Sequence, residues 1–471
     1  MREGSPAAAR HTGDVTLVTC VDVGSTFTKG VLIDVQATDP DRLVVATAAH
    51  PTTIAADVMD GVDAVCRVLA AHAEGTSQAG LGSPAGNPSP GESLLVCSSA
   101  GGGLRIAVVG QELEVSAEAG RRVALSAGGR VVHVSSGELT AAEVRALRNA
   151  APDLVLLVGG TDGGNAAVLL HNADCLARAR IKAPIVVAGN ADAADEVCRV
   201  LAATGRRHQL APNVVPRIGE ISPTGARTAI RAAFLDHVIG GKGLSKGRAF
   251  ADMVLAPTPD VVLRGVEVLA EVVGGDVLVI DIGGATTDVY SVITPQGEDA
   301  TIRRDVVGQL WHARTVEADL GMRWSAEGIV EAASRERIPL SDTTIAYAVR
   351  VVADPSHLAS SVEDWAAERE LASSAATIAV RRHGRPAHPS EAPRPLADVT
   401  LVLGSGGVLR HSPSEVSAAV LDAVSADHGG GWRVPAEPRT GVDTAYLLFA
   451  VGLLADRHPT AARALAGRIT T

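Results

Sequence analysis

Two short segments of this chain place an aspartate, a glycine turn and hydroxyl side chains at the end of an apolar run. In the first, CVDVGSTFTKGVLIDV (residues 20–35), Asp22 precedes the turn. The residues there that could contact phosphate oxygens are Gly24, Ser25, Thr26, Thr28 and Lys29. Glycine admits a close backbone approach, amides and hydroxyls donate to phosphate oxygens, and a carboxylate can hold hydrated Mg²⁺. The segment could form half of a nucleotide clamp, although an ordinary polar hairpin turn explains it equally well when it is taken alone.

The second segment, VLVIDIGGATTDVYSV (residues 277–292), repeats this arrangement after a fully apolar run. Its polar and glycine positions are Asp281, Gly283, Gly284, Thr286, Thr287 and Asp288. Two copies of one pattern are hard to obtain from packing requirements alone. Two carboxylates around a glycine turn suit phosphoryl transfer, because one can fix Mg²⁺ and water while the other orients or deprotonates the attacking water. The pair of segments therefore predicts nucleotide hydrolysis or transfer.

A third segment, LVLGSGGVL (residues 401–409), places small residues after a predicted strand. They are Gly404, Ser405, Gly406 and Gly407. Small residues let a flat base or a ribose lie against the backbone, and a following helix N-terminus favours a phosphate. An ordinary strand-to-helix turn accounts for the same residues if this segment is considered alone.

The elements that must position these segments follow an α/β pattern. Apolar runs at residues 15–23 and 276–282 predict strands that end at the two glycine turns, and their separation suggests two similar lobes. Between them, predicted strands alternate with predicted helices, which favours layered α/β structure. We expect a disordered tail over residues 1–13, a first lobe over 14–270 and a second lobe over 271–471, whose C-terminal helix could return to the first lobe. Residues 75–93 are rich in Gly, Ser and Pro and predict a flexible loop.

Composition excludes several other classes of function. The formal charge of −11 and an aromatic content of 2% disfavour nucleic acid as a partner. The longest useful apolar stretch, residues 444–455, is too short for the roughly 20 residues that cross a bilayer. The N-terminus lacks the apolar core of a signal peptide, so we expect a cytoplasmic protein with no membrane contact. The five cysteines are scattered and form no CxxC pair, which argues against a disulfide framework or a metal cage.

The three segments, in this order, resemble those of the actin, Hsp70 and sugar-kinase superfamily of ATPases. The resemblance implies an α/β fold with two ribonuclease-H-like lobes around a nucleotide cleft that holds ATP and Mg²⁺. It implies that Asp22, Asp281 and Asp288 are the catalytic carboxylates, with Asp22 and Asp281 holding Mg²⁺ through water. The two hairpins would contact the phosphates, and Gly404 to Gly407 would face the adenosine.

Further segments resemble a narrower group, the MutL-type accessory family of glutamate mutase (methylaspartate mutase). Among them are SSAGGGLRIAVVG (residues 98–110), LVLLVGGTDGGN (154–165), PTPDVVLRGVEVLA (257–270) and VDTAYLLFAVGLLA (442–455). This resemblance implies an ATP-dependent, chaperone-like factor that assembles, protects or reactivates an adenosylcobalamin-dependent carbon-skeleton mutase. It leaves open which mutase is served and whether the chain forms a homodimer.

Two other functions remain compatible with the same three segments. One is an ATP-dependent amidohydrolase of the hydantoinase or oxoprolinase kind, in which ATP turnover would require a cyclic amide. The other is a small-molecule kinase, which would transfer the γ-phosphate to a substrate. The glycine-rich run at residues 159–165 follows a predicted buried strand, a position that often carries function in α/β folds, but a plain turn would have the same composition.

Overall fold

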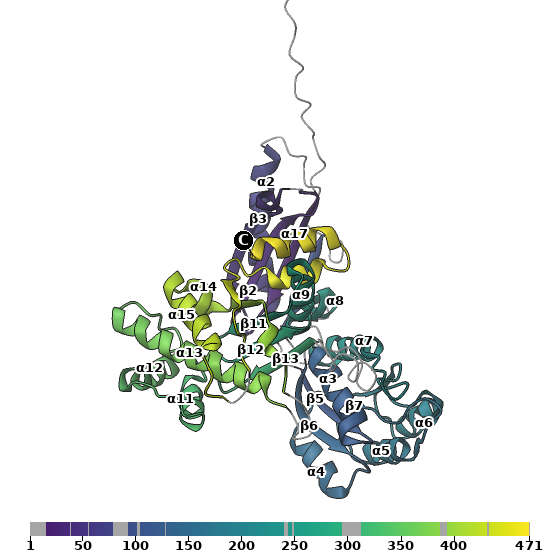
Figure 1. Cartoon of the computed structure of the whole chain (residues 1–471). Helices are drawn as coiled ribbons and strands as arrows, with labels where there is room; N and C mark the ends of the chain where they lie inside the picture. Colours follow the sequence, from purple (N-terminus) through teal and green to yellow (C-terminus); the bar gives the residue numbers. More distant parts are fainter. Residues whose placement is uncertain are drawn as a thin grey trace, which may run out of the picture.

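The computed structural model describes residues 16–37, 39–54, 56–78, 93–100, 104–127, 129–239, 244–246, 249–293, 312–386, 393–430 and 433–470. The tail predicted over residues 1–13 lies outside these ranges, and so does the predicted loop over residues 75–93, apart from its two ends. Within the described residues, three five-stranded sheets organise the chain (Figure 1). No described helix is long and apolar enough to cross a membrane.

The first sheet has the strand order β10-β4-β1-β2-β3. Its strands are β1 (Leu17–Val23), β2 (Phe27–Asp34), β3 (Val44–Pro51), β4 (Leu94–Ser98) and β10 (Val254–Pro257). β1, β2 and β3 form an antiparallel meander, whereas β4 runs parallel to β1 and β10 runs parallel to β4. Helices α1 (Pro40–Leu43) and α2 (Val58–Gln78) accompany this sheet. Helix α2 continues past the point at which the loop was expected to begin.

The second sheet repeats that arrangement, with the order β13-β12-β11-β14-β15. Its strands are β11 (Val277–Ile282), β12 (Thr287–Val292), β13 (His312–Glu317), β14 (Leu401–Ser405) and β15 (Arg439–Val442). Again three strands form an antiparallel meander and two run parallel to its first strand. Its helices are α11 (Ala326–Arg335), α12 (Asp342–Ala353), α13 (Val362–Gly384), α14 (Gly407–His411) and α15 (Ser414–Ser425), with a 3₁₀ turn at Leu396–Asp398. Two sheets of this topology confirm the predicted fold of paired ribonuclease-H-like lobes.

The third sheet is entirely parallel and has the order β6-β5-β7-β8-β9. Its strands are β5 (Arg105–Gly110), β6 (Arg130–Ser136), β7 (Leu154–Leu157), β8 (Ile185–Val187) and β9 (His208–Leu210). Its helices are α3 (Glu118–Ser126), α4 (Ala141–Asn149), α5 (Ala167–Arg178), α6 (Ala194–Ala203) and α7 (Pro223–Ala233), with π-helical turns at Leu113–Ala117 and Phe234–Ile239 and a 3₁₀ turn at Ala191–Ala193. The short α8 (Ala249–Met253) leads back to β10. Because β4 and β10 are neighbours in the first sheet, residues 104–239 form an insertion, which we call the inserted domain.

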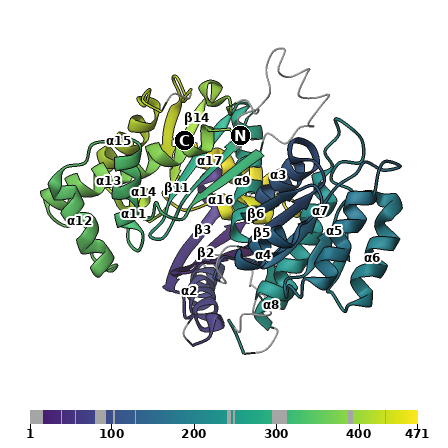
Figure 2. The same cartoon turned by 90° about the horizontal axis from the view of Figure 1, so that it is seen from below.

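Three helices join the two lobes: α9 (Thr258–Val273), α16 (Leu448–Leu454) and α17 (Pro459–Ile469). One buried cluster contains Cys20 of β1, Val279 of β11 and residues of all three helices, so the lobes share a core. α9 and α16 cross closely at two glycines, because a Cβ on Gly265 would collide with the carbonyl of Leu448 and one on Gly452 with that of Val261. In both views the inserted domain and helices α11–α13 lie on opposite sides of the molecule, with α9 between them (Figures 1 and 2).

Strand alternation distributes the apolar residues to separate cores. In β1, Val21 and Val23 belong to the core shared with the inserted domain, whereas Val18 and Cys20 face the core of the joining helices. Successive side chains of a strand point to opposite faces, so a sheet covered on both sides is apolar throughout. The polar exceptions are therefore informative, and the clearest of them is Asp22, which is only 2% exposed.

Candidate functional site

The two predicted hairpins have the same local geometry. Asp22 pairs with Lys29 across β1 and β2, and Asp281 pairs with Asp288 at the equivalent position of β11 and β12. Both turns close with a backbone hydrogen bond, from Gly24 N to the carbonyl of Phe27 at 3.1 Å and from Gly283 N to the carbonyl of Thr286 at 2.9 Å. Each lobe thus presents a glycine turn beside the carboxyl end of its first strand.

The predicted hydroxyl side chains divide into two groups. Ser25 and Thr26 are exposed at the tip of the first hairpin, and Thr286 is half-buried in the second. Thr28 and Thr287 are fully buried instead. Thr28 Oγ1 lies 3.2 Å from Thr52 Oγ1, and Thr287 Oγ1 donates to the carbonyl of Leu320 at 2.5 Å. The structure therefore places Thr28 and Thr287 among packing residues, away from solvent, and only the first group is accessible to a ligand.

Asp22 is enclosed by side chains from β4, from α9 and from the segment that precedes α16. Its Oδ1 accepts a hydrogen bond from Thr258 Oγ1 at 2.5 Å and lies 3.6 Å from Cys97 Sγ. Its Oδ2 accepts one from Tyr446 Oη at 3.0 Å. Burial and the neighbouring Asp22 carboxylate raise the pKa of both the Cys97 thiol and the Tyr446 phenol, so both groups stay protonated and able to donate. Both carboxylate oxygens of Asp22 are consequently satisfied from within the protein.

Two cations flank the ring of Tyr446. Lys29 Nζ lies 3.6 Å from the ring centroid and the guanidinium of Arg410 lies 5.1 Å from it, both within cation–π range. Arg410 also donates from Nε to the carbonyl of Thr444 at 3.1 Å. Burial lowers the pKa of Lys29, and nearby Asp22, Asp281 and Asp443 partly oppose that shift. These residues of both lobes form one coupled group of charges.

Asp281 differs from Asp22, because among the described residues it has no hydrogen-bond or ion-pair partner. It is half-buried at the end of β11. Burial, followed by repulsion from Asp288, raises its pKa to about 6, and Lys29 acts in the opposite direction. An uncompensated carboxylate in this position favours either a proton or a cation.

Asp288 is already paired. Arg314 of β13 donates to its Oδ1 from Nε at 2.9 Å and from Nη2 at 2.6 Å, and Thr286 Oγ1 donates to its Oδ2 at 3.1 Å. The side chain of Arg314 is only 6% exposed and that of Asp288 15% exposed. The two predicted carboxylates of the second hairpin therefore differ in character, since one is neutralised and the other is not.

The predicted glycine turn lies directly against the second hairpin, but only Gly406 and Gly407 follow the strand. Gly404 and Ser405 are instead the last two residues of β14, and both are buried. Gly404 pairs with Ile280, and Ser405 pairs with Asp281. Gly406 has φ +90°, and a Cβ there would collide with the carbonyl of Ile282 and approach Asp281 Oδ1 to 2.6 Å. Only glycine fits such a position without strain. Gly407 is exposed and begins α14, and a Cβ on it would meet nothing within 4 Å.

Several residues of this group were not predicted from the sequence: Thr258, Arg314, Arg410, Asp443 and Tyr446. Asp443 is buried and accepts hydrogen bonds from the backbone N–H of Leu447 and Leu448 at 2.8–3.0 Å, so it caps the start of α16. Burial raises the pKa of Asp443 despite these bonds. An aspartate shortly before an apolar run is a helix-start signal that could have indicated Asp443. Nothing local distinguishes the other four.

The residues present fit Mg²⁺ at Asp281 better than at Asp22. The half-buried Asp281 carboxylate has no hydrogen-bond or ion-pair partner within the part of the chain that the structure describes. A hard cation such as Mg²⁺ prefers carboxylate and water oxygens. Asp22 is only 2% exposed, and its two oxygens already accept hydrogen bonds from Thr258 and Tyr446, so an ion would reach it only after these contacts change. No cluster of three or more His, Cys, Asp or Glu side chains with metal-binding geometry occurs among the described residues.

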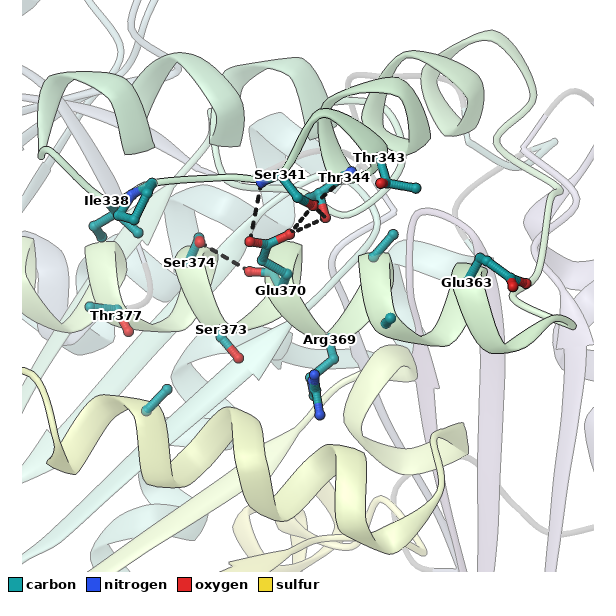
Figure 3. Close-up of a pocket in the computed structure, with 14 residues that line it drawn as sticks. Ile338, Ser341, Thr343, Thr344, Glu363, Arg369, Glu370, Ser373, Ser374 and Thr377 are labelled. Atoms are coloured by element: carbon teal, nitrogen blue, oxygen red, sulfur yellow. Dashed lines mark hydrogen bonds between the residues drawn. The ribbon is translucent and has the colours of Figure 1, made fainter.

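A separate cavity of about 610 Å³ lies in the second lobe, between α12, α13 and the end of α15 (Figure 3). Glu370 points into a group of hydroxyls, where Ser341 Oγ donates to it at 2.6 Å, and Thr344 also bonds to it. None of the predicted site residues lines this cavity. It is therefore distinct from the group of charges around Asp22 and Asp281.

A family model described as MutL protein matches residues 18–469 of this chain. The chain belongs to the MutL family. A curated relative, "Protein MutL" of Clostridium tetanomorphum, is 34% identical over 461 residues, which is 93% of this chain and 96% of the relative. The family resemblance predicted from the sequence is thereby confirmed.

Solved structures share less with this member of the MutL family. Nucleotide-free acetone carboxylase has 15% identity and a TM-score of 0.40, and the match covers 94% of this chain and 70% of that chain. ATP-dependent caprolactamase from Pseudomonas jessenii has 12% identity and a TM-score of 0.34, covering 93% and 70% respectively. Likenesses at this level support no conclusion about function.

Proposed function

We propose that this MutL-family chain binds Mg-ATP between its two lobes and uses ATP hydrolysis to remodel a partner enzyme. The observation that carries the proposal is the pair of equivalent hairpins, each with a carboxylate at the end of its first strand, placed over one shared core. A ligand bound to both hairpins would favour the closed arrangement of the lobes, and its hydrolysis would release them.

In this proposal each accessible group has a role. Ser25 and Thr26 would donate to phosphate oxygens from the first hairpin, and the amides around Gly283 and Gly284 would do so from the second. Asp281 would hold Mg²⁺ through water, and the ion would neutralise phosphate charge. Of the third segment, the exposed Gly407 would face the adenosine, because Gly404, Ser405 and Gly406 are buried. Lys29 interacts electrostatically with Asp22 and Asp281. If its contact with the Tyr446 ring changed, Lys29 would contribute positive charge toward the phosphates.

We infer that the partner is an adenosylcobalamin-dependent carbon-skeleton mutase such as glutamate mutase, on the basis of membership in the MutL family. A radical enzyme that loses its adenosyl group retains an inactive cobalamin, and expelling that cofactor requires the enzyme to open. A two-lobed ATPase can supply such a motion, because its two nucleotide states differ in lobe arrangement.

The test is reactivation of a purified mutase that has been inactivated by a damaged cobalamin. Recovery of activity should require this chain, Mg-ATP and free adenosylcobalamin together. It should be lost with a non-hydrolysable ATP analogue and with Asp281→Asn. Equal recovery with and without the chain would contradict the accessory role. ATP turnover only with a cyclic amide, or a phosphorylated small product, would instead favour the amidohydrolase or the kinase.

A further inference from the structure

The first turn of α9 carries two buried side chains that point to different parts of the molecule. Thr258, the first residue of the helix, is 7% exposed and donates to Asp22 Oδ1 beside the first hairpin. Asp260, two residues later, is 2% exposed and contacts the inserted domain. One helical turn therefore belongs to both the nucleotide site and the interface with the insertion.

Asp260 is held by two arginines from α7. Arg227 Nη2 donates to its Oδ1 at 3.1 Å, and Arg231 donates to its Oδ2 from Nε at 2.9 Å and also from Nη2. The arginine fork fixes a carboxylate in direction as well as in position. Asp260 and Thr258 lie in the same first turn of α9, so the clamp on Asp260 restrains the backbone that also carries Thr258.

A second contact further along α9 strengthens this connection. Glu267 lies seven residues after Asp260, on the same face of the helix, and Arg227 reaches it at 3.8 Å. His312 of β13 lies 2.8 Å from Glu267 through Nδ1, and Arg264 donates to it at 2.8 Å. The inserted domain and the second sheet thus contact the same face of α9.

We propose that the inserted domain is coupled to the nucleotide cleft through the first turn of α9, where Arg227 and Arg231 clamp Asp260 and thereby position Thr258 against Asp22. Asp260 is a positioning residue in this scheme, since it acts on the cleft through Thr258. The inference rests on the proposed function, because the affinity for Mg-ATP is the quantity by which the coupling is measured. A displacement of the inserted domain by a partner would change the affinity for Mg-ATP, and nucleotide binding would change the inserted domain in return, because equilibrium coupling is reciprocal.

The test is a double-mutant cycle between Arg231→Met and Thr258→Val, with the dissociation constant for Mg-ATP as the readout. Each single change should shift the dissociation constant by about fivefold or more, the lower range of measured couplings between sites. If both act through the same turn, Arg231→Met should have little further effect in the Thr258→Val background. Arg231→Lys keeps the positive charge but loses the two-nitrogen contact with Asp260, so its dissociation constant should lie between those of the wild type and Arg231→Met. If Arg231→Met does not fold, Arg231→Lys replaces it in the cycle. The matched control is Arg178→Met, which removes an exposed ion pair with Asp174 on α5 of the same domain and should leave the affinity unchanged.

Amide hydrogen exchange of the nucleotide-free protein provides a readout that does not need ATP. Arg231→Met should speed exchange in α7, in the first turn of α9 and in residues 17–30 around Asp22, whereas Arg178→Met should not. If exchange spreads in this way but the wild type does not bind Mg-ATP, the proposed function fails and the coupling stands. If exchange changes only in α7, or if the cycle is additive, the coupling through α9 is overturned.

Discussion

Tyr446 Oη donates a hydrogen bond to Asp22 Oδ2 at 3.0 Å, joining residues that lie 424 positions apart. Tyr446 adopts φ +55°, a left-handed conformation that is costly for a bulky residue. Its backbone N–H bonds to the carbonyl of Asp443, and Asp443 in turn caps α16. The start of α16 thus holds Tyr446 in place, and Tyr446 in turn covers and hydrogen-bonds the Asp22 carboxylate of the first hairpin.

Tyr446→Phe should destabilise the protein while leaving the ring beneath Lys29 in place. The variant removes a hydrogen-bond donor from a buried carboxylate, so we expect the free energy of unfolding to fall by about 1.5–3 kcal/mol. Urea unfolding of the nucleotide-free protein measures this change. Tyr446→Leu also removes the ring that Lys29 contacts and should cost more. A Tyr446→Phe protein as stable as the wild type would show that the hydroxyl does not support Asp22.

Asp281→Asn should stabilise the nucleotide-free protein above pH 6. The folded protein raises the pKa of Asp281 to about 6, whereas a free aspartate has a pKa of about 3.9. Between these values the folded state retains a proton that the unfolded chain has released, so the free energy of unfolding falls as the pH rises through this window. The loss is at most about 3 kcal/mol, at about 1.4 kcal/mol for each pKa unit.

Urea unfolding between pH 4 and 8 separates this effect from a general change of charge. Asp281→Asn should flatten the profile between about pH 4 and 6, and Asp422→Asn, at an exposed position of α15, should leave the profile unchanged. If the proposed function holds, Mg-ATP at 100 times its dissociation constant should stabilise the wild type by about 2.7 kcal/mol, whereas the Asp281→Asn protein should gain little. A wild-type pH profile without this decline would contradict the assignment of Asp281 as an uncompensated carboxylate.

The hairpins and the lobes could be predicted because their signals are local. Apolar runs of strand length ending in Asp-x-Gly and hydroxyls indicate both the strand and its turn, and the repetition indicates two lobes. The alternation of side chains along a strand could also have separated Thr28 from Lys29, since neighbours in β2 cannot both face the same side. The fully buried Thr28 and Thr287 follow that rule.

The contacts that close the site could not be predicted, because they join distant parts of the chain. Thr258 lies 236 residues from Asp22, and Tyr446 lies further still. A threonine at a helix start and a tyrosine before an apolar helix have no local feature that names a buried aspartate as their partner. The same holds for Arg314, whose pairing with Asp288 depends on β13 lying beside β12.

Gly406→Ala and Gly407→Ala form a matched pair in adjacent positions. At Gly406 the new Cβ would meet Ile282 and Asp281 in a backbone with φ +90°, so we expect a loss of about 1–3 kcal/mol or more in the free energy of unfolding. At Gly407 a Cβ has open space and the residue begins a helix, so alanine should be neutral or stabilising by up to about 1 kcal/mol. Thermal unfolding of both proteins distinguishes them, and equal effects would contradict the close approach of Gly406 to the second hairpin.

Arg314→Met should be among the most destabilising single changes at the site. It leaves the Asp288 carboxylate, 15% exposed, without the guanidinium that now contacts it through two nitrogens. Breaking a buried ion pair from one side costs about 3–5 kcal/mol, because the remaining charge is uncompensated. The double variant Arg314→Met with Asp288→Asn removes that charge and should recover a large part of the loss. The exposed pair Arg335–Glu331 on α11 offers the control, where Arg335→Met should cost less than about 1 kcal/mol. If the double variant is no more stable than Arg314→Met, the cost comes from lost packing of the arginine and not from the charge of Asp288.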